Sequence, residues 1–379
     1  MAVTRPSKPG QSPRVTFVRR LRRRFGFIDS VVVATRPLRW KLAVVRAWVA
    51  LVGGGLVHWV RGQTPKPGHL ALVTLFMETG GRVNDTLAGA VAAFHPPYAL
   101  PPAHGVLGNL DADNLGRIQE QLERDGYYVF ENALSPEFCD NVVRQSLELD
   151  YLIMGDEAVA QGIPQLGRFD RAQPMAPQYS ATRDDTTDIA EVQQLISDPS
   201  IITVAQNYLK SKPIFTGIYM GWSAAVKDTP DQNAAQEFHW DMERIKWLRF
   251  FIYLTDVGPE NGPHCFIRGS HRTGAIPPDL LKLGYVRHRD GSIIQRYGHE
   301  NYREFTGGRG TIVAEDSRGF HKGKMPTSGD RLLLAFEVSN TTFGVNKRHL
   351  IRNVHVPRLV EFARQYPRVY RNLDFAKPL

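Results

Sequence analysis

Three side chains of this sequence have the types and the spacing to hold a metal ion. His239 and Asp241 form an H-x-D pair in a strand-like stretch. Side chains two positions apart on a strand point to the same face, so one imidazole and one carboxylate can reach one ion. We expect the third ligand to be His321, in the segment 319–323. Two histidines and one carboxylate leave three octahedral positions open, which suits iron(II) that binds a bidentate co-substrate and then O2.

A fourth residue makes this prediction more specific. Arg331 lies ten positions after His321 and opens the apolar run 331–338, where Arg331, Leu333 and Ala335 share one face of the expected strand. An arginine that points into a barrel of apolar side chains needs a carboxylate partner. A bidentate guanidinium–carboxylate pair fits the distal end of 2-oxoglutarate. The alternative is that Arg331 pairs with Glu337 or with another acid of the chain.

The elements that must position these residues are predicted to be mainly strands. From about residue 213, strand-like runs are separated by Gly, Pro and Asn, as in 258–263, which is typical of a sandwich or barrel. The expected strands are 127–130, 214–222, 247–257, 265–267, 310–314 and 331–338. The expected helices are 112–125, a helix from the Ser135-Pro136 start to about Leu149, 187–196 and 199–210.

Composition and charge exclude several function classes. The 379 residues are 42% hydrophobic, as in a folded globular protein, and the two cysteines are too few for a disulfide framework. We therefore expect a reducing compartment, the cytoplasm. Residues 1–61 contain 13 Lys and Arg and one acid, Asp29, whereas the remaining residues contain 34 basic and 37 acidic side chains. The basic charge thus belongs to an N-terminal arm, and the sequence shows no nucleic-acid-binding motif.

The arm contains the most apolar run of the chain, residues 42–60, which approaches the length of a membrane span. Arg46, His58 and the triplet Gly53–Gly55 oppose a span. A positive-inside orientation would also place the rest of the chain away from cytosolic iron(II) and 2-oxoglutarate. Two alternatives stay open: a peripheral contact of residues 14–60 with an anionic membrane, or a helix packed on the catalytic domain. Residues 62–109 are predicted to be an irregular linker.

Several other residues compete for roles at the site. Glu243, two positions beyond Asp241, becomes a rival ligand if the strand continues. His264 is a candidate for the pocket wall, His271 is expected to brace a loop, and Trp240 is expected to point away from the metal. A basic cluster is either a solvated rim or a site for an anionic group of the substrate. Its members are Arg318, Lys322, Lys324, Lys347 and Arg348.

Taken together, the motifs resemble the phytanoyl-CoA dioxygenase family from about Leu110 to Val345. Residues 126–130 followed by 134–137 resemble the family's opening strand and helix, and residues 261–263 followed by 269–272 resemble its "NGP…PGSH" loop. The metal-binding candidates and Arg331 fall where the family has its iron and 2-oxoglutarate ligands. Two departures are Arg268, where the family usually has Pro, and Lys322, where many members have a small or hydroxyl residue.

The resemblance implies a mainly β domain with flanking helices over residues 110–379, folded as a double-stranded β-helix (a cupin-like jelly roll). It implies a non-haem Fe(II)- and 2-oxoglutarate-dependent dioxygenase that uses O2 and acts on a small or lipid-like organic substrate. Relatives that halogenate replace the carboxylate ligand by a small residue, so Asp241 favours hydroxylation with release of succinate and CO2. Two other classes stay open: a cupin-like metalloenzyme without redox chemistry, and a membrane-associated binding module with a degenerate site.

Overall fold

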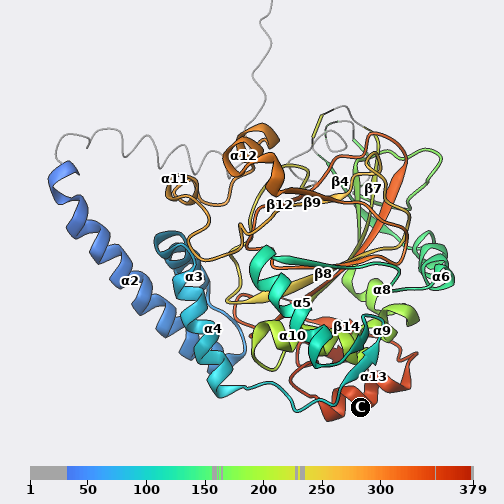
Figure 1. Cartoon of the computed structure of the whole chain (residues 1–379), viewed down its shortest axis with the longest axis horizontal. Helices are drawn as coiled ribbons and strands as arrows, with labels where there is room; N and C mark the ends of the chain where they lie inside the picture. Colours follow the sequence, from blue (N-terminus) through green and yellow to red (C-terminus); the bar gives the residue numbers. More distant parts are fainter. Residues whose placement is uncertain are drawn as a thin grey trace, which may run out of the picture.

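The fold combines a β domain, a layer of helices beneath it and a helical hairpin along one side (Figure 1). The computed structural model describes residues 32–376 except 156–159, 161, 164, 227–228, 231–234 and 346, and it describes side chains from residue 41 onward. The predicted N-terminal tail, including the arginine-rich run 19–24, lies outside the described residues.

Two antiparallel sheets form the β domain, which confirms the predicted fold class. The larger sheet has the order β3-β11-β8-β13-β7-β6-β4-β5, and the smaller has the order β10-β9-β12. The larger sheet contains β3 (Tyr127–Phe130), β4 (Tyr151–Met154), β5 (Leu166–Gly167), β6 (Gln178–Ala181), β7 (Ile214–Ala224), β8 (Trp247–Tyr253), β11 (Ile312–Glu315) and β13 (Asp330–Ser339). The smaller contains β9 (His264–Ile267), β10 (Tyr302–Phe305) and β12 (His321–Gly323).

On strand β13, successive side chains alternate between the hydrophobic core and a cavity. Leu332 and Leu334 are fully buried in the main hydrophobic core, against the helices. Arg331, Leu333 and Ala335 point the other way and line a cavity between the two sheets. Successive side chains of a strand alternate between faces, so one strand contributes to both environments. The predicted common face of these three residues is therefore confirmed.

Helices cover the core side of the larger sheet (Figure 1). They are α5 (Ala112–Asp125), α6 (Pro136–Ser146), α8 (Arg183–Thr187), α9 (Ala190–Ile196), α10 (Pro199–Leu209) and α13 (Pro357–Gln365). α5 ends where Gly126 adopts φ 93°, and α6 begins where the Ser135 hydroxyl accepts a hydrogen bond from the N–H of Phe138. Both ends match the prediction, because capping signals are local in sequence.

Some predicted boundaries are wrong. α6 ends at Ser146 rather than near Leu149, and β8 ends at Tyr253 rather than at residue 257. The single helix expected over 187–196 is divided between α8 and α9. β11 begins at Ile312, because Gly310 adopts φ 91° in the preceding turn. Shorter elements complete the fold: β1 (Ala103–Gly105), β2 (Gly108–Leu110), α11 (Pro278–Leu281), α12 (Asp290–Tyr297), η1 (His299–Asn301), β14 (His349–Ile351) and β15 (Leu373–Phe375).

The expectation of an irregular segment over 62–109 is wrong for its first part. After α2 (Val32–Arg61), helices α3 (Lys66–Thr79) and α4 (Arg82–Phe94) follow. Several of the Pro and Gly residues that suggested irregularity lie at helix ends or at a helix crossing. Pro65 precedes the first turn of α3, and Gly80 closes that helix with φ 60°. Asn84 of α4 is fully buried and donates to the carbonyl of Arg244, so these helices pack on the β domain.

Candidate metal centre

The three predicted metal ligands come together where the two sheets meet. One ligand atom each from His239, Asp241 and His321 lies within 4.8 Å of the others, and all three residues are buried. The H-x-D segment does not form a regular strand. Instead, His239 pairs with His321 through two backbone hydrogen bonds of 3.0 and 2.9 Å, and the N–H of Asp241 donates to the carbonyl of Ser317 at 2.9 Å.

Both imidazoles are oriented for metal binding. The Nδ1 of His239 lies 3.0 Å from the carbonyl oxygen of Glu237, and the Nδ1 of His321 lies 3.0 Å from that of Gly319. A carbonyl can only accept, so each Nδ1 carries the proton and each Nε2 keeps its lone pair. Burial lowers the pKa of both rings, which favours the neutral form that binds metal.

Asp241 supplies the negative charge of the centre. Burial opposes its ionisation, but the neighbouring Arg249 holds the pKa of this carboxyl well below its ordinary value. Its Oδ2 lies 2.9 Å from Nη1 of Arg249 and 3.6 Å from Nε2 of His321. The ion pair with Arg249 lacks hydrogen-bond geometry, and no other described residue donates a hydrogen bond to this buried oxygen. An ionised carboxylate oxygen with unused acceptor capacity beside two imidazoles fits a divalent transition metal.

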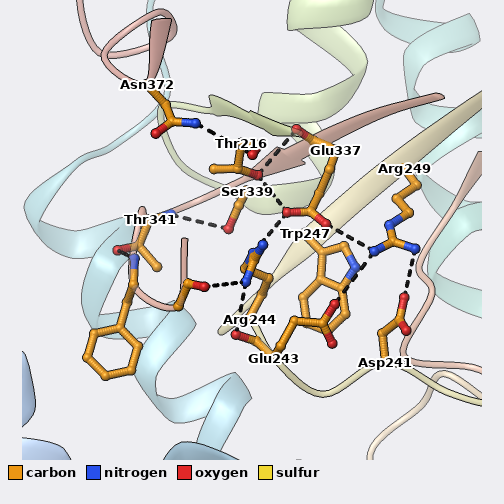
Figure 2. Close-up of polar contacts among 12 residues, drawn as sticks. Thr216, Asp241, Glu243, Arg244, Trp247, Arg249, Glu337, Ser339, Thr341 and Asn372 are labelled. Atoms are coloured by element: carbon orange, nitrogen blue, oxygen red, sulfur yellow. Dashed lines mark hydrogen bonds and ion pairs between the residues drawn. The ribbon is translucent and has the colours of Figure 1, made fainter. Parts of the chain in front are cut away.

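Arg249 belongs to a buried ion network that the sequence reasoning missed (Figure 2). Its Nη2 lies 3.1 Å from Oε2 of Glu337, whose Oε1 accepts from Nε of Arg244 at 2.8 Å. The hydroxyl of Thr216 donates to the same Oε1 at 2.9 Å. The network fixes the Arg249 guanidinium between Glu337 and Asp241, so it can orient the ligand carboxylate from outside.

Arg331 has a different environment, although it is also buried. Its Nη1 donates to the carbonyl of Gly262, its Nη2 lies 3.4 Å from Oγ of Ser223, and its buried Nε has no partner. Within the part of the chain that the structure describes, no carboxylate pairs with it. Glu337, the predicted alternative partner, pairs with Arg244 and Arg249 instead. Burial lowers the pKa of Arg331, since a guanidinium without a counter-charge is poorly stabilised there.

A cavity of about 370 Å³ connects these groups. Both arginines, Arg249 and Arg331, line it together with the imidazoles of His239 and His321. Its walls come from β7, β8 and β13 of the larger sheet and from β9 and β12 of the smaller. The volume is in the range that accommodates small-molecule ligands. The two histidine ligands and the predicted carboxylate-binding arginine therefore face one cavity, and Asp241 lies beside those histidines.

The prediction that His264 lines the pocket is confirmed, and the structure adds a partner that was not predicted. Its Nε2 lies 2.8 Å from Oε2 of Glu315, and both side chains are fully buried. Burial lowers the pKa of His264 to about 3 and raises the pKa of Glu315 to about 8. A protonated Glu315 therefore donates to a neutral His264 at neutral pH.

The other rival residues take structural roles. Glu243 lies outside the metal-ligand group and 3.6 Å from Arg249, so it does not replace Asp241 in the cluster. Trp240 points away from the ligands and stacks on His288, as expected. His271 is buried close behind Gly126, consistent with a loop brace. The adjoining Ser270 accepts from the N–H of Phe320 and so supports the strand that carries His321.

The basic cluster is not a shared cationic surface. Four of its members each pair with an acid, and the described lining of the cavity includes none of the five. The pairs are Arg318 with Asp316 and Asp85, Lys322 with Asp290, Lys324 with Glu304, and Arg348 with Asp374. Arg318 and Lys322 are also buried, so the solvated-rim interpretation is wrong for them.

Comparison with protein families matches residues 122–331, more than half of the chain, to phytanoyl-CoA dioxygenase (PhyH). No curated protein sequence matches the chain.

Several solved structures are similar. The non-heme alpha-ketoglutarate-dependent epimerase SnoN from nogalamycin biosynthesis has 18% identity and a TM-score of 0.45, over 60% of this chain and 84% of SnoN. EctD from S. alaskensis has 18% identity and a TM-score of 0.43, over 65% and 83%. HygX from Streptomyces hygroscopicus, solved with nickel, 2-oxoglutarate and hygromycin B, has 15% identity and a TM-score of 0.41, over 64% and 93%.

Proposed function

The chain belongs to the phytanoyl-CoA dioxygenase family, and from this premise we propose that it is an iron(II)- and 2-oxoglutarate-dependent dioxygenase that hydroxylates a small organic substrate. His239, Asp241 and His321 would hold the iron, and Arg331 would hold the distal carboxylate of 2-oxoglutarate. The observation that carries the proposal is the buried Arg331, which has no acid partner among the described residues and faces the same cavity as the His-Asp-His cluster.

The charge balance of the cavity supports a dianionic co-substrate. A buried cation without a counter-charge is costly, and a carboxylate that binds it bidentately relieves that cost. Arg249 already has the carboxylates of Asp241 and Glu337 beside it, so it does not need an external anion. Arg331 does. The carbonyl of Gly262 and the hydroxyl of Ser223 fix the orientation of its guanidinium without neutralising it.

The protein's own contribution to the reaction is positioning and exclusion of water. When bound, iron and 2-oxoglutarate would allow O2, the oxidant, to insert one oxygen atom into a substrate C–H bond and the other into succinate, with loss of CO2. The backbone carbonyls of Glu237 and Gly319 hold the two ligand imidazoles in one tautomer. Arg249 keeps Asp241 ionised and oriented. Phe251 and Leu333, which also line the cavity, restrict water around the reacting groups.

The retained carboxylate supports hydroxylation as the outcome. A variant ligand set with a small residue at position 241 would leave a coordination position for halide, as the family resemblance implies. Here Asp241 is buried, ionised and supported by Ser317 and Arg249. Oxygen transfer to the substrate, with succinate and CO2 as co-products, is therefore the reaction we propose.

We propose further that the substrate presents neutral hydrogen-bonding groups rather than a charge or a long alkyl chain. Once the metal ligands, Arg331 with its neighbour Ser223, and the paired side chains of Arg249 and His264 are assigned, the remaining polar lining is Gln178, Ser180 and Tyr219. The Oε1 of Gln178 is buried and has no hydrogen-bond partner among the described residues. An acceptor left unpaired in a pocket wall favours a ligand with a donor group.

Turnover of 2-oxoglutarate tests the function directly. Purified protein with iron(II) should convert 2-oxoglutarate to succinate slowly without substrate, and faster with a hydroxyl- or amide-bearing substrate that gains one oxygen atom by mass spectrometry. A Gln178→Ala variant should keep the slow turnover and lose the stimulation. Absence of succinate from the wild-type protein would contradict the proposal and favour a cupin-like enzyme without redox chemistry.

A further inference from the structure

Helix α2 has two apolar faces, and only one of them is covered. Ala47, Leu51 and Gly54 are buried and belong to the side that packs on α3. A Cβ added at Gly54 would lie 2.6 Å from the Cα of Gly68, so this glycine permits the close helix crossing. The Gly triplet that weakened the prediction of a membrane span therefore has a packing role at its middle residue.

The opposite face exposes large apolar side chains along the whole described length of the helix. Val49 is 69% exposed, Leu56 62% and Trp59 84%. These residues follow the spacing of three and four that places side chains on one helix face. The members of this face, here called the α2 stripe, are Leu42, Val45, Val49, Val52, Leu56 and Trp59. A contiguous apolar stripe of this length on a soluble fold marks an interaction surface.

The charges that α2 and the start of α3 carry in the sequence are all positive. Between Asp29 and Glu78 the sequence contains six Lys and Arg and no acid. The exposed Lys41 stands at one end of the stripe and Arg61 at the other. Exposed Trp48 and Trp59 add aromatic rings of the kind that favour the level of lipid headgroups. Basic residues beside an apolar face fit a surface that is apolar within and negatively charged at its boundary.

The same helix is held to the protein in a way that opposes insertion across a bilayer. By length and composition it is the one described helix that could span, over Lys41–Arg61. Its covered face, however, packs with Ile245 and Phe343 of the β domain. His58 also lies 3.1 Å from the hydroxyl of Thr342, which follows β13. A span would have to break these contacts and expose the covered face to lipid.

A second exposed apolar segment lies between the hairpin and the metal centre. Leu283, Tyr285 and Val286 are 56%, 54% and 36% exposed, and the adjoining Gly284 lies against Met77 of α3. The ring centroid of Tyr285 is 6.1 Å from that of His239. This exposed apolar segment therefore lies next to both α3 and the candidate active site.

From these observations we infer that the α2 stripe docks the protein on the surface of an anionic membrane, with the helix lying in the headgroup region. The packed helix and the peripheral membrane contact, which the sequence left as alternatives, are then two faces of one element. The inference does not depend on iron or 2-oxoglutarate, so it stands or falls separately from the proposed activity.

Vesicle sedimentation of the full chain tests the inference. The probes are vesicles of phosphatidylcholine alone and of an equimolar mixture with phosphatidylglycerol. Wild-type protein should sediment with the mixed vesicles and less with phosphatidylcholine alone, and added salt should weaken the binding. The double variant Val49→Glu/Leu56→Glu should lose about tenfold or more in vesicle affinity, because two charges replace side chains that enter the apolar boundary.

A matched control places the same new charges elsewhere. Met175→Glu/Val354→Glu alters two exposed apolar residues (51% and 43%) outside α2 and should bind vesicles as the wild type does. Thermal melts of both variants check that each is folded. Failure of the wild type to bind mixed vesicles, or equal binding by the α2 variant, would overturn the inference. The inference would also be overturned if the wild type formed a dimer that binds no vesicles and that the α2 substitutions convert to a monomer. A second copy of the chain would then be the partner that covers the α2 stripe.

Discussion

Two walls of one cavity each carry a buried arginine, and the two differ in their acid partners. On β8, Arg249 lies between the carboxylates of Asp241 and Glu337. On the neighbouring strand β13, Arg331 contacts only a carbonyl and a hydroxyl. Arg331 is buried and Arg249 is largely buried, and both lie on the same side of the sheet.

The difference separates an internal role from an external one. A buried arginine that the protein neutralises itself stabilises the fold and orients its partners. A buried arginine that the protein leaves without a counter-charge is prepared for an anion from solution. Arg249 therefore serves to orient the metal ligand Asp241, whereas Arg331 serves to bind the co-substrate. Glu315 shows the same principle for an acid. It is buried without a cationic partner, so burial raises its pKa and it keeps its proton.

Replacing Arg249 should have the largest effect on stability. Arg249→Met leaves the buried Asp241 without a cationic partner and Glu337 with Arg244 alone, so the free energy of unfolding should fall by about 3–5 kcal/mol. Urea denaturation of the metal-free protein measures this change. The double variant Arg249→Met/Asp241→Asn should recover a large part of the loss in the metal-free protein, because the carboxylate that lost its partner is then removed as well. A loss below about 1 kcal/mol in the single variant would show that the network is not the stabilising element assumed here.

Replacing Arg331 should weaken the binding of 2-oxoglutarate rather than the stability of the fold. Arg331→Met should raise the dissociation constant for 2-oxoglutarate on the order of 100-fold, since a bidentate charged contact is lost. The stability of the protein without ligand should not fall, because the substitution removes a buried unpaired cation. Calorimetric titration and a thermal melt measure the two effects. Arg331→Lys is the control: it keeps the charge but not the planar fork, so its affinity should lie between the two. Unchanged binding in Arg331→Met would contradict the assignment.

Glu315 predicts a pH dependence. In the folded protein its pKa is raised to about 8 from 4.5, so the folded state holds a proton that the unfolded state has lost. Stability should therefore fall as the pH rises between these values. His264, with a pKa lowered to about 3 from 6.5, acts in the opposite direction only below pH 6.5.

Between pH 6.5 and about pH 8, His264 no longer contributes. Glu243, whose pKa burial raises to about 7, also titrates there, and comparison with a Glu315 variant cancels its contribution. Across this window, the wild type should lose about 2 kcal/mol relative to Glu315→Gln, whose amide can still donate to His264 without titrating. Thermal melts across this range compare the two proteins. Parallel pH profiles would show that Glu315 is ionised in the folded state.

Ser223 should have the smallest effect. Its hydroxyl lies 3.4 Å from Nη2 of Arg331, a long contact that helps to aim the guanidinium but carries no charge. Ser223→Ala should weaken 2-oxoglutarate binding by about threefold or less. A loss as large as that of Arg331→Met would mean that Ser223 binds the co-substrate directly, so that Arg331 would not be the main anchor on β13.

The sequence predicted those parts of the fold whose signals are local. The cap at Ser135 and the stop at Gly126 located α6 and α5, because each signal lies beside the helix end that it defines. α3 and α4 were missed for the complementary reason. Their prolines and glycines suggested a loop, but Gly68 serves a contact with Gly54 that only the folded hairpin contains.

The candidate site likewise contains residues that the sequence could predict and residues that it could not. His239, Asp241, His321 and Arg331 were identifiable from residue type and spacing along the chain. The structure brings the first three together and places His239, His321 and Arg331 at one cavity. Arg249 and Glu337 were not identifiable as a pair, because they are 88 residues apart and only the register of β8 against β13 places them opposite each other. Buried charges inside apolar strands were the one signal that the sequence offered for them.

Anaerobic reconstitution tests the central claim most directly. Iron(II) added to the protein with 2-oxoglutarate, in the absence of O2, should produce the weak visible charge-transfer band of a chelated 2-oxoglutarate–iron(II) complex. Asp241→Ala should abolish the band through loss of the metal, and Arg331→Met should shift its appearance to much higher 2-oxoglutarate concentrations. Absence of the band from the wild type, or an unchanged titration in both variants, would contradict the account.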